Sequence, residues 1–127
     1  MPATPYTQAL ETAVTAVMEN FPQGDDFVSE SFLGRLHGDN AWDLEAYSRL
    51  DGALTFLTEH FAGADVPREV AWPVVRIFSP AMTHIAAHFN AAATYRIKAD
   101  SDTLFDLRCR FQSVIEGLFE GRARAAC

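Results

Sequence analysis

The chain has 127 residues, of which 49% are hydrophobic and 12% aromatic, and its formal net charge is −7 at pH 7. This composition predicts one globular domain and argues against a disordered chain. The apolar runs are too short for a transmembrane helix, and the acidic balance argues against nucleic-acid binding.

The amino-terminal residues carry neither a basic segment nor an apolar stretch, so we expect no signal peptide and a cytoplasmic protein. The chain has two cysteines, Cys109 and Cys127. Disulfides are rare in the cytoplasm, so we expect both thiols to be reduced.

Helical periodicity dominates the first third of the chain. The apolar residues Leu10, Val14 and Val17 recur at helical spacing, and the segment 22–24 (Pro-Gln-Gly) ends this first helix. A short second helix is expected over about residues 29–36, because Ser29 is a good N-cap and Gly38 can close the helix.

A third helix is predicted to begin with Asn40 as its N-cap and to end at Gly63. Its apolar stripe consists of Tyr47, Leu50, Leu54, Leu57 and Phe61. On its solvent side, Glu45 and Arg49 stand four residues apart, a spacing that favours an ion pair.

A fourth helix is predicted to begin at Pro67, and its sequence is so apolar that we expect it to be the central and most buried one. Because proline removes a helix hydrogen bond, Pro73 is expected to kink this helix. Pro80 is expected to break it or to bend it more strongly.

A final helix is predicted from Asp100 or Ser101 to Gly121, with an ion pair between Asp106 and Arg110. Residues 122–127 resemble a frayed tail. The predicted fold is an all-α, single-domain bundle of four to five helices over residues 1–127, with its core at about 6–121 and a central helix kinked by proline.

Charge is divided unevenly along the chain. Residues 1–65 hold eleven acidic and two basic side chains, a net charge of −9, whereas residues 66–127 hold six acidic and eight basic ones, a net charge of +2. A surface of one sign attracts a partner of the other sign. The acidic half therefore suggests a basic protein as the partner.

The acidic third helix and the loop before it are the predicted contact surface for that partner. The candidate partner-binding residues are Asp39, Trp42, Asp43, Glu45, Tyr47 and Asp51. Trp42 lies among acids at the helix start, and tryptophan is enriched among the residues that dominate binding interfaces. Two alternatives remain for these carboxylates: a merely solvated helix face, or acid–base catalysis if burial shifts their pKa values.

Catalytic and metal-binding arrangements are weakly represented. His84 and His88 are the only candidates for a metal pair, because they stand at i and i+4 on one predicted helix. A third ligand is not apparent, and the glutamate that follows the first histidine in metalloproteases is replaced by Ile85. The chain therefore suggests no enzyme, no metal and no cofactor.

Three short blocks resemble the immunity protein 41 family, small bacterial proteins encoded beside polymorphic or contact-dependent toxins. They are residues 31–38 (SFLGRLHG), 66–72 (VPREVAW) and 110–117 (RFQSVIEG), with His88-Phe89 between them. The similarity runs from about Asp26 to Gly121. It implies an inhibitor that binds the carboxy-terminal toxin domain of its own system, and it implies no particular functional residues.

Together, charge and resemblance predict a non-enzymatic immunity protein that neutralises a toxin domain, such as a basic nuclease, by stoichiometric occlusion. Two alternatives remain open. The chain could be a small metal-binding protein or enzyme that uses His84 and His88, or an interaction module unrelated to toxins.

Overall fold

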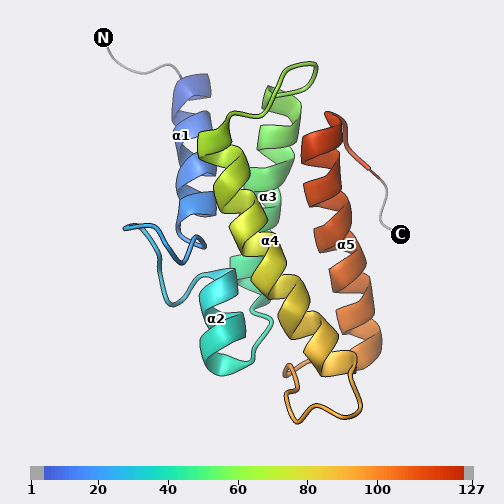
Figure 1. Cartoon of the computed structure of the whole chain (residues 1–127). Helices are drawn as coiled ribbons and strands as arrows, with labels where there is room; N and C mark the ends of the chain where they lie inside the picture. The colour runs from blue at the N-terminus through green and yellow to red at the C-terminus, as the bar shows by residue number, and fades with distance from the viewer. Residues whose placement is uncertain (1–4, 125–127) are drawn as a thin grey trace.

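The computed structural model describes residues 5–124, and its regular structure in that range consists of five α-helices without a strand (Figure 1). They are α1 (Pro5–Met18), α2 (Phe32–Asp39), α3 (Leu44–His60), α4 (Arg68–Phe89) and α5 (Ser101–Glu120). The predicted all-α bundle is confirmed. In the same range, a helix of the length and apolarity needed to cross a membrane is not found.

The helices form two layers. One contains α1, α3 and α5 side by side, with α3 in the middle, and the other contains α4, which crosses in front, and the short α2 (Figure 1). The expectation that the proline-containing helix is central is wrong. α3 packs against both of its neighbours, whereas α4 buries a single face and leaves Trp72 54% exposed.

The fourth helix continues without interruption through both of its prolines. The break that was expected at Pro80 therefore does not occur. Each proline removes one backbone donor from the helix, a loss that burial on either side can offset. Val74, Ile77 and Ala81 are all at most 1% exposed and anchor the helix before and after these sites.

An aromatic cluster joins the two layers at the centre of the bundle. Phe32 and Phe111 are fully buried, with their ring centroids 5.6 Å apart. Trp42 and Tyr47 lie against Phe32 at 4.7 and 5.4 Å, and Phe78 of α4 lies 5.8 Å from Phe111. Aromatic pairs add about 0.5–1.5 kcal/mol each beyond their burial, so the cluster holds four of the five helices together.

Asn20 connects the end of α1 to the start of α2. Its side-chain amide donates to the backbone carbonyl of Ala16 at 3.0 Å, and its Oδ1 accepts from the backbone N–H of Leu33 at 2.9 Å. The side chain is 4% exposed. A buried backbone N–H left without a partner is costly, so Asn20 fixes where α2 begins.

Gly34 allows the segment before α2 to lie directly on that helix. A Cβ at this position would lie 2.4 Å from the carbonyl oxygen of Ser29 and 2.8 Å from that of Val28. Both contacts involve backbone atoms, which cannot swing aside as a side chain can. The close approach therefore requires glycine.

The caps of α2 and α3 differ from the sequence prediction. Ser31, rather than Ser29, caps α2, and its Oγ accepts from the N–H of Gly34 at 3.1 Å. Asn40 is not the N-cap of α3: it ends α2 in the left-handed region, at φ 54°, two residues beyond Gly38. Asp43 caps α3 by accepting from the N–H of Ala46 at 3.0 Å.

The last helix has the predicted caps, Asp100 at its start and Gly121 in the left-handed region at its end. Of the tail, Arg122 and Arg124 form ion pairs with Glu120, at 2.7 and 3.4 Å. Cys109 is disulfide-bonded, so the expectation of a reduced thiol is wrong at this position. Cys127 lies outside the described residues.

Replacing Asn20 tests the connection between α1 and α2. Asn20→Ala leaves the buried N–H of Leu33 without an acceptor, and we expect a loss of about 2 kcal/mol in the free energy of unfolding. Urea denaturation followed by circular dichroism measures it. Gln23→Ala, at an exposed position in the same connection, serves as the control and should change little. Equal stability of the two variants would contradict this role for Asn20.

Candidate partner-binding groove

The structure divides the six predicted partner-binding residues between the surface and the interior. Trp42 and Tyr47 are 7% and 6% exposed and belong to the aromatic cluster, so their predicted direct contact with a partner is not possible in this conformation. Burial, followed by the charge of Asp51, raises the pKa of Tyr47 well above its ordinary value. Both aromatic residues support the surface from beneath.

Asp51 has a structural partner. Its carboxylate accepts two hydrogen bonds from the guanidinium of Arg110, at 2.9 and 3.0 Å, and so joins α3 to α5. The predicted pairing of Arg110 with Asp106 is therefore replaced by a pair between helices. A bidentate pair fixes both position and orientation, so Asp51 is committed to the fold.

The remaining three candidates, Asp39, Asp43 and Glu45, lie at or beside a groove of about 600 Å³. The end of α1, the segment before α2, and the first turns of α2 and α3 form its walls. Its charged lining residues are the carboxylates Glu19, Glu30, Asp43 and Glu45 and the guanidinium groups of Arg35 and Arg49.

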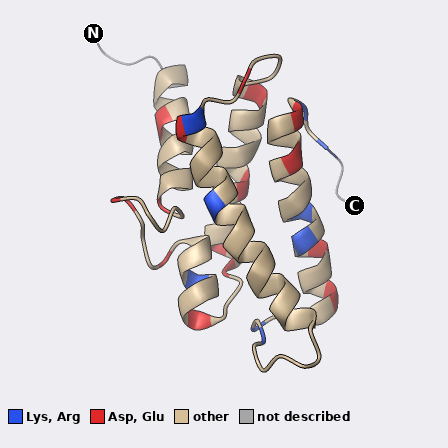
Figure 2. Ribbon diagram, viewed as in Figure 1, with Lys and Arg blue, Asp and Glu red and all other residues tan. Residues whose placement is uncertain are grey.

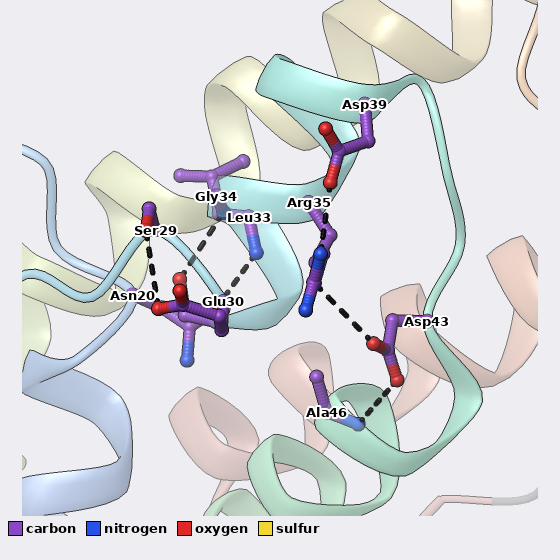
Figure 3. A network of polar contacts seen from close by, with 10 residues as sticks. Asn20, Ser29, Glu30, Leu33, Gly34, Arg35, Asp39, Asp43 and Ala46 are labelled. Carbon is purple, nitrogen blue, oxygen red and sulfur yellow. Dashed lines mark hydrogen bonds and ion pairs between the residues drawn. The ribbon is translucent and has the colours of Figure 1, made fainter.

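Arg35 occupies the side of this groove nearest α2. Its Nη1 donates to Asp39 at 3.1 Å, and its Nε lies 3.6 Å from Asp43, which also caps α3 (Figure 3). The hydrogen bond to Asp39 is the main reason that the pKa of Arg35 is raised. Among the described residues, Nε itself has no hydrogen-bond partner. The arginine thus holds the starts of α2 and α3 at a fixed separation.

The opposite side of the groove carries a second arginine. Arg49 pairs with Glu19, which directly follows α1, at 2.9 Å, rather than with Glu45 as predicted. The side chain of Glu45 consequently has no ion pair or hydrogen bond within residues 5–124. Glu30 accepts a hydrogen bond from Ser29 at 3.1 Å and has no ion pair in that range. The groove therefore presents two carboxylates outside an ion pair. The charge of Glu30 nevertheless adds to the contacts of Asp39 and Asp43 in raising the pKa of Arg35, whereas Glu45 has no arginine of this kind.

Acidic side chains elsewhere do not gather on one face. Figure 2 shows acidic segments near both ends of the bundle and along α5. Six carboxylates pair with arginines among residues 5–124, namely Glu19, Asp39, Asp43, Asp51, Glu116 and Glu120. The charge imbalance of the sequence is thus largely dispersed. The groove brings two carboxylates without an ion pair, Glu30 and Glu45, to one concave surface, whereas smaller hollows lined by Glu59 and by Glu69 hold one each.

The two histidines proposed as a metal pair serve different sites. His88 is buried, its Nδ1 accepts from the N–H of Ile97 at 2.9 Å, and its Nε2 contacts the hydroxyl of Ser101 at 3.2 Å. His84 instead faces His37, with 3.4 Å between Nε2 and Nδ1. Residues 5–124 contain no group of three or more His, Cys, Asp or Glu side chains arranged to hold a metal.

Glu19 and Glu30 were missed by sequence reasoning. Neither belongs to the acidic helix that drew attention, and Glu30 lies in an irregular segment with no periodicity to interpret. Tertiary hydrogen bonds bring them to the groove that Glu45 also lines: Leu33 N–H donates to Asn20, and Val28 N–H donates to the carbonyl of Glu19. Arg35 lies within the sequence block 31–38 quoted above, and it contacts two carboxylates, those of Asp39 and Asp43.

Comparison with protein families, with curated proteins and with solved structures gave no match. The resemblance to the immunity protein 41 family therefore remains a prediction that depends on the short blocks of sequence quoted above.

Asp51 can be tested as a structural residue. Asp51→Asn removes the charge that Arg110 contacts, and we expect a loss of about 1–2 kcal/mol in the free energy of unfolding. The same substitution in an Arg110→Gln background should cost much less, because the pair is already absent. Urea denaturation of the four proteins in this cycle measures the coupling. If Asp51→Asn lowered the free energy of unfolding equally in both backgrounds, the ion pair between Asp51 and Arg110 would be contradicted.

The histidine pair predicts a dependence of stability on pH. Burial, followed by the charge of His37, lowers the pKa of His84 below its ordinary value near 6.5. The folded state then binds fewer protons than the unfolded state, so the stabilisation is present above about pH 6.5 and is lost as the pH falls through the lowered pKa.

Urea midpoints at about pH 5 and about pH 7.5 measure this effect. In His84→Gln the midpoint should change less between the two pH values than in the unaltered protein. Thr83→Gln alters a side chain without a titrating group at an exposed position on the same helix, and it should leave the change as it is in the unaltered protein. If His84→Gln left the difference unaltered, the assignment to His84 would be wrong.

Proposed function

We propose that this chain is a non-enzymatic immunity protein that binds a cognate bacterial toxin domain in the cytoplasm and neutralises it by occlusion. The observation that carries the proposal is the groove in which the exposed carboxylates of Glu30 and Glu45 stand outside an ion pair among the described residues. A lysine or arginine of a basic toxin surface would supply the missing positive charge.

The groove suits rigid recognition of such a side chain. Asn20 and the Ser31 cap fix one wall, and the Arg35–Asp43 contact holds the other. Little conformational entropy would then be lost on binding, which favours affinity. The net charge of −7 would also speed the encounter with a cationic partner at low salt.

Inhibition by occlusion requires no chemistry from the chain. It requires a complex that forms quickly and dissociates slowly. Electrostatic steering would favour fast association, and a preformed groove would favour slow dissociation. A nuclease with a basic cleft is the toxin class that this charge pattern fits best. An interaction module that binds a basic protein other than a toxin would use the same groove and is the alternative.

Charge reversal in the groove tests the binding site. Glu30→Lys with Glu45→Lys should weaken the affinity for the basic partner by about 100-fold or more, because two attractive contacts become repulsive. Binding kinetics against the purified toxin domain, at two salt concentrations, provide the measurement. The proposal predicts that a secreted toxin is encoded beside this chain, and the carboxy-terminal domain of that toxin is the partner to purify.

A matched control is Asp65→Lys with Asp106→Lys, which changes the net charge equally at exposed positions outside the groove. It should slow association slightly and leave dissociation unaltered. Equal losses of affinity in both double variants would mean that only the net charge determines binding. That result would overturn the groove as the binding site. Failure of the unaltered chain to rescue growth when co-expressed with the toxin domain would overturn the immunity function itself.

A further inference from the structure

The outward face of α4 carries a largely apolar stripe that the described chain covers only in part: Met82 packs partly against the core, and the guanidinium of Arg76 lies 5.9 Å from the centroid of the Trp72 ring. Its exposed aromatic ends are Trp72, at 54%, and Phe89, at 48%, and Val75 between them is 44% exposed. The complete stripe consists of Trp72, Val75, Ser79, Met82, Ala86 and Phe89. From Trp72 to Phe89 the helix has one charged side chain, Arg76. The solvent side of a surface helix is normally charged or polar.

The spacing of this stripe is that of a helix-pairing seam. Successive members are separated by three, four, three, four and three residues. Apolar residues that alternate at three and four positions form the contact line of coiled coils, in which each side chain fits between those of a facing helix. The stripe is therefore shaped for another helix, and α4 itself lies at the front of the bundle, where Figure 1 shows no other helix before it.

We propose that the covering helix is α4 of a second copy of this chain, packed antiparallel about a two-fold axis. The seam reads the same in both directions, since its spacings are symmetric about the midpoint between Ser79 and Met82. In that arrangement Trp72 faces Phe89 of the second copy, Val75 faces Ala86, and Ser79 faces Met82. The large rings of Trp72 and Phe89 meet at both ends of the seam. Between the ends, each small side chain, Ala86 or Ser79, faces a larger one.

The charges around the seam agree with self-association. Arg76 and its counterpart would be nine residues apart along the pair, roughly 13 Å at 1.5 Å per residue, so their repulsion would be screened. Glu69, in the first turn of α4, would lie beside the loop that follows α4 in the second copy. That loop carries Arg96 and Lys98, which are both exposed.

Two other occupants fit less well. An anionic membrane surface requires lysine and arginine along the polar edges of such a helix, whereas this chain has a net charge of −7 and the seam has only Arg76 beside it. The basic partner proposed above would bind the groove, to which no residue of α4 contributes. Self-association thus goes beyond the proposed function and can fail without affecting it.

The contact is small, which sets the expected affinity. Half-exposed aromatic rings and the short side chains between them would bury roughly 400–600 Å² per copy, below the ~800 Å² typical of stable complexes. We therefore expect a dimer whose dissociation constant is in the micromolar range. Monomer should dominate in dilute solution.

Sedimentation velocity on the full chain between about 1 and about 300 µM is the test. The unaltered chain should shift from monomer to dimer, and the tryptophan emission should shift to the blue as Trp72 becomes covered. Val75→Lys and Ala86→Glu should each weaken dimerisation at least about 100-fold, because each inserts an unpaired charge at two symmetric places. Phe105→Glu, at a 52% exposed aromatic position on α5, is the control and should dimerise normally.

Mixing the two charged variants makes the test specific to orientation. Only the antiparallel register brings the lysine introduced at position 75 of one variant against the glutamate introduced at position 86 of the other. The mixture should therefore form a heterodimer although neither variant dimerises alone. A monomeric unaltered chain at about 300 µM would overturn the proposal. So would a loss of dimer in Phe105→Glu, or a mixture that stays monomeric. Circular dichroism verifies that every variant is folded.

Discussion

The contact of Phe32 with its aromatic neighbours is the interaction on which the molecule depends most. Its ring meets those of Trp42, Tyr47 and Phe111, and so joins α2 to the connection that follows it, to α3 and to α5. The same residue lines the floor of the groove, whose upper walls include the first turns of α2 and α3. Because interiors pack to near-crystalline density, the core cannot rearrange without shifting the groove carboxylates above it.

Local sequence signals explain most of the helices and few of the charged contacts. The apolar stripes of α1, α3 and α5 predicted real helices, because burial of one face is a repeating local pattern. The pairs predicted at i and i+4 did not form. Arg110 and Arg49 reached Asp51 and Glu19 instead, since a contact between helices brings partners that no local spacing reveals.

The errors in the caps and in the position of α4 have a common origin. Asn40 is a good residue both for starting a helix and, in the left-handed region, for ending one, and only the neighbouring Asp43 decides between them. α4 was expected to be central because it is apolar all round. A hydrophobic sequence indicates that a helix face is to be covered, but it does not say what covers it. A surface helix with an exposed apolar face therefore resembles a core helix in sequence.

Gly34 gives the groove a property that its charges do not have. The wall that carries Glu30 is placed by backbone resting on backbone, where any side chain would intrude. The position of this wall is consequently independent of the side chains that project from it. Carboxylates on the rim of the groove could be replaced by other groups while the walls keep their positions. Related proteins could therefore change partners by substitutions at the rim alone and retain the same fold.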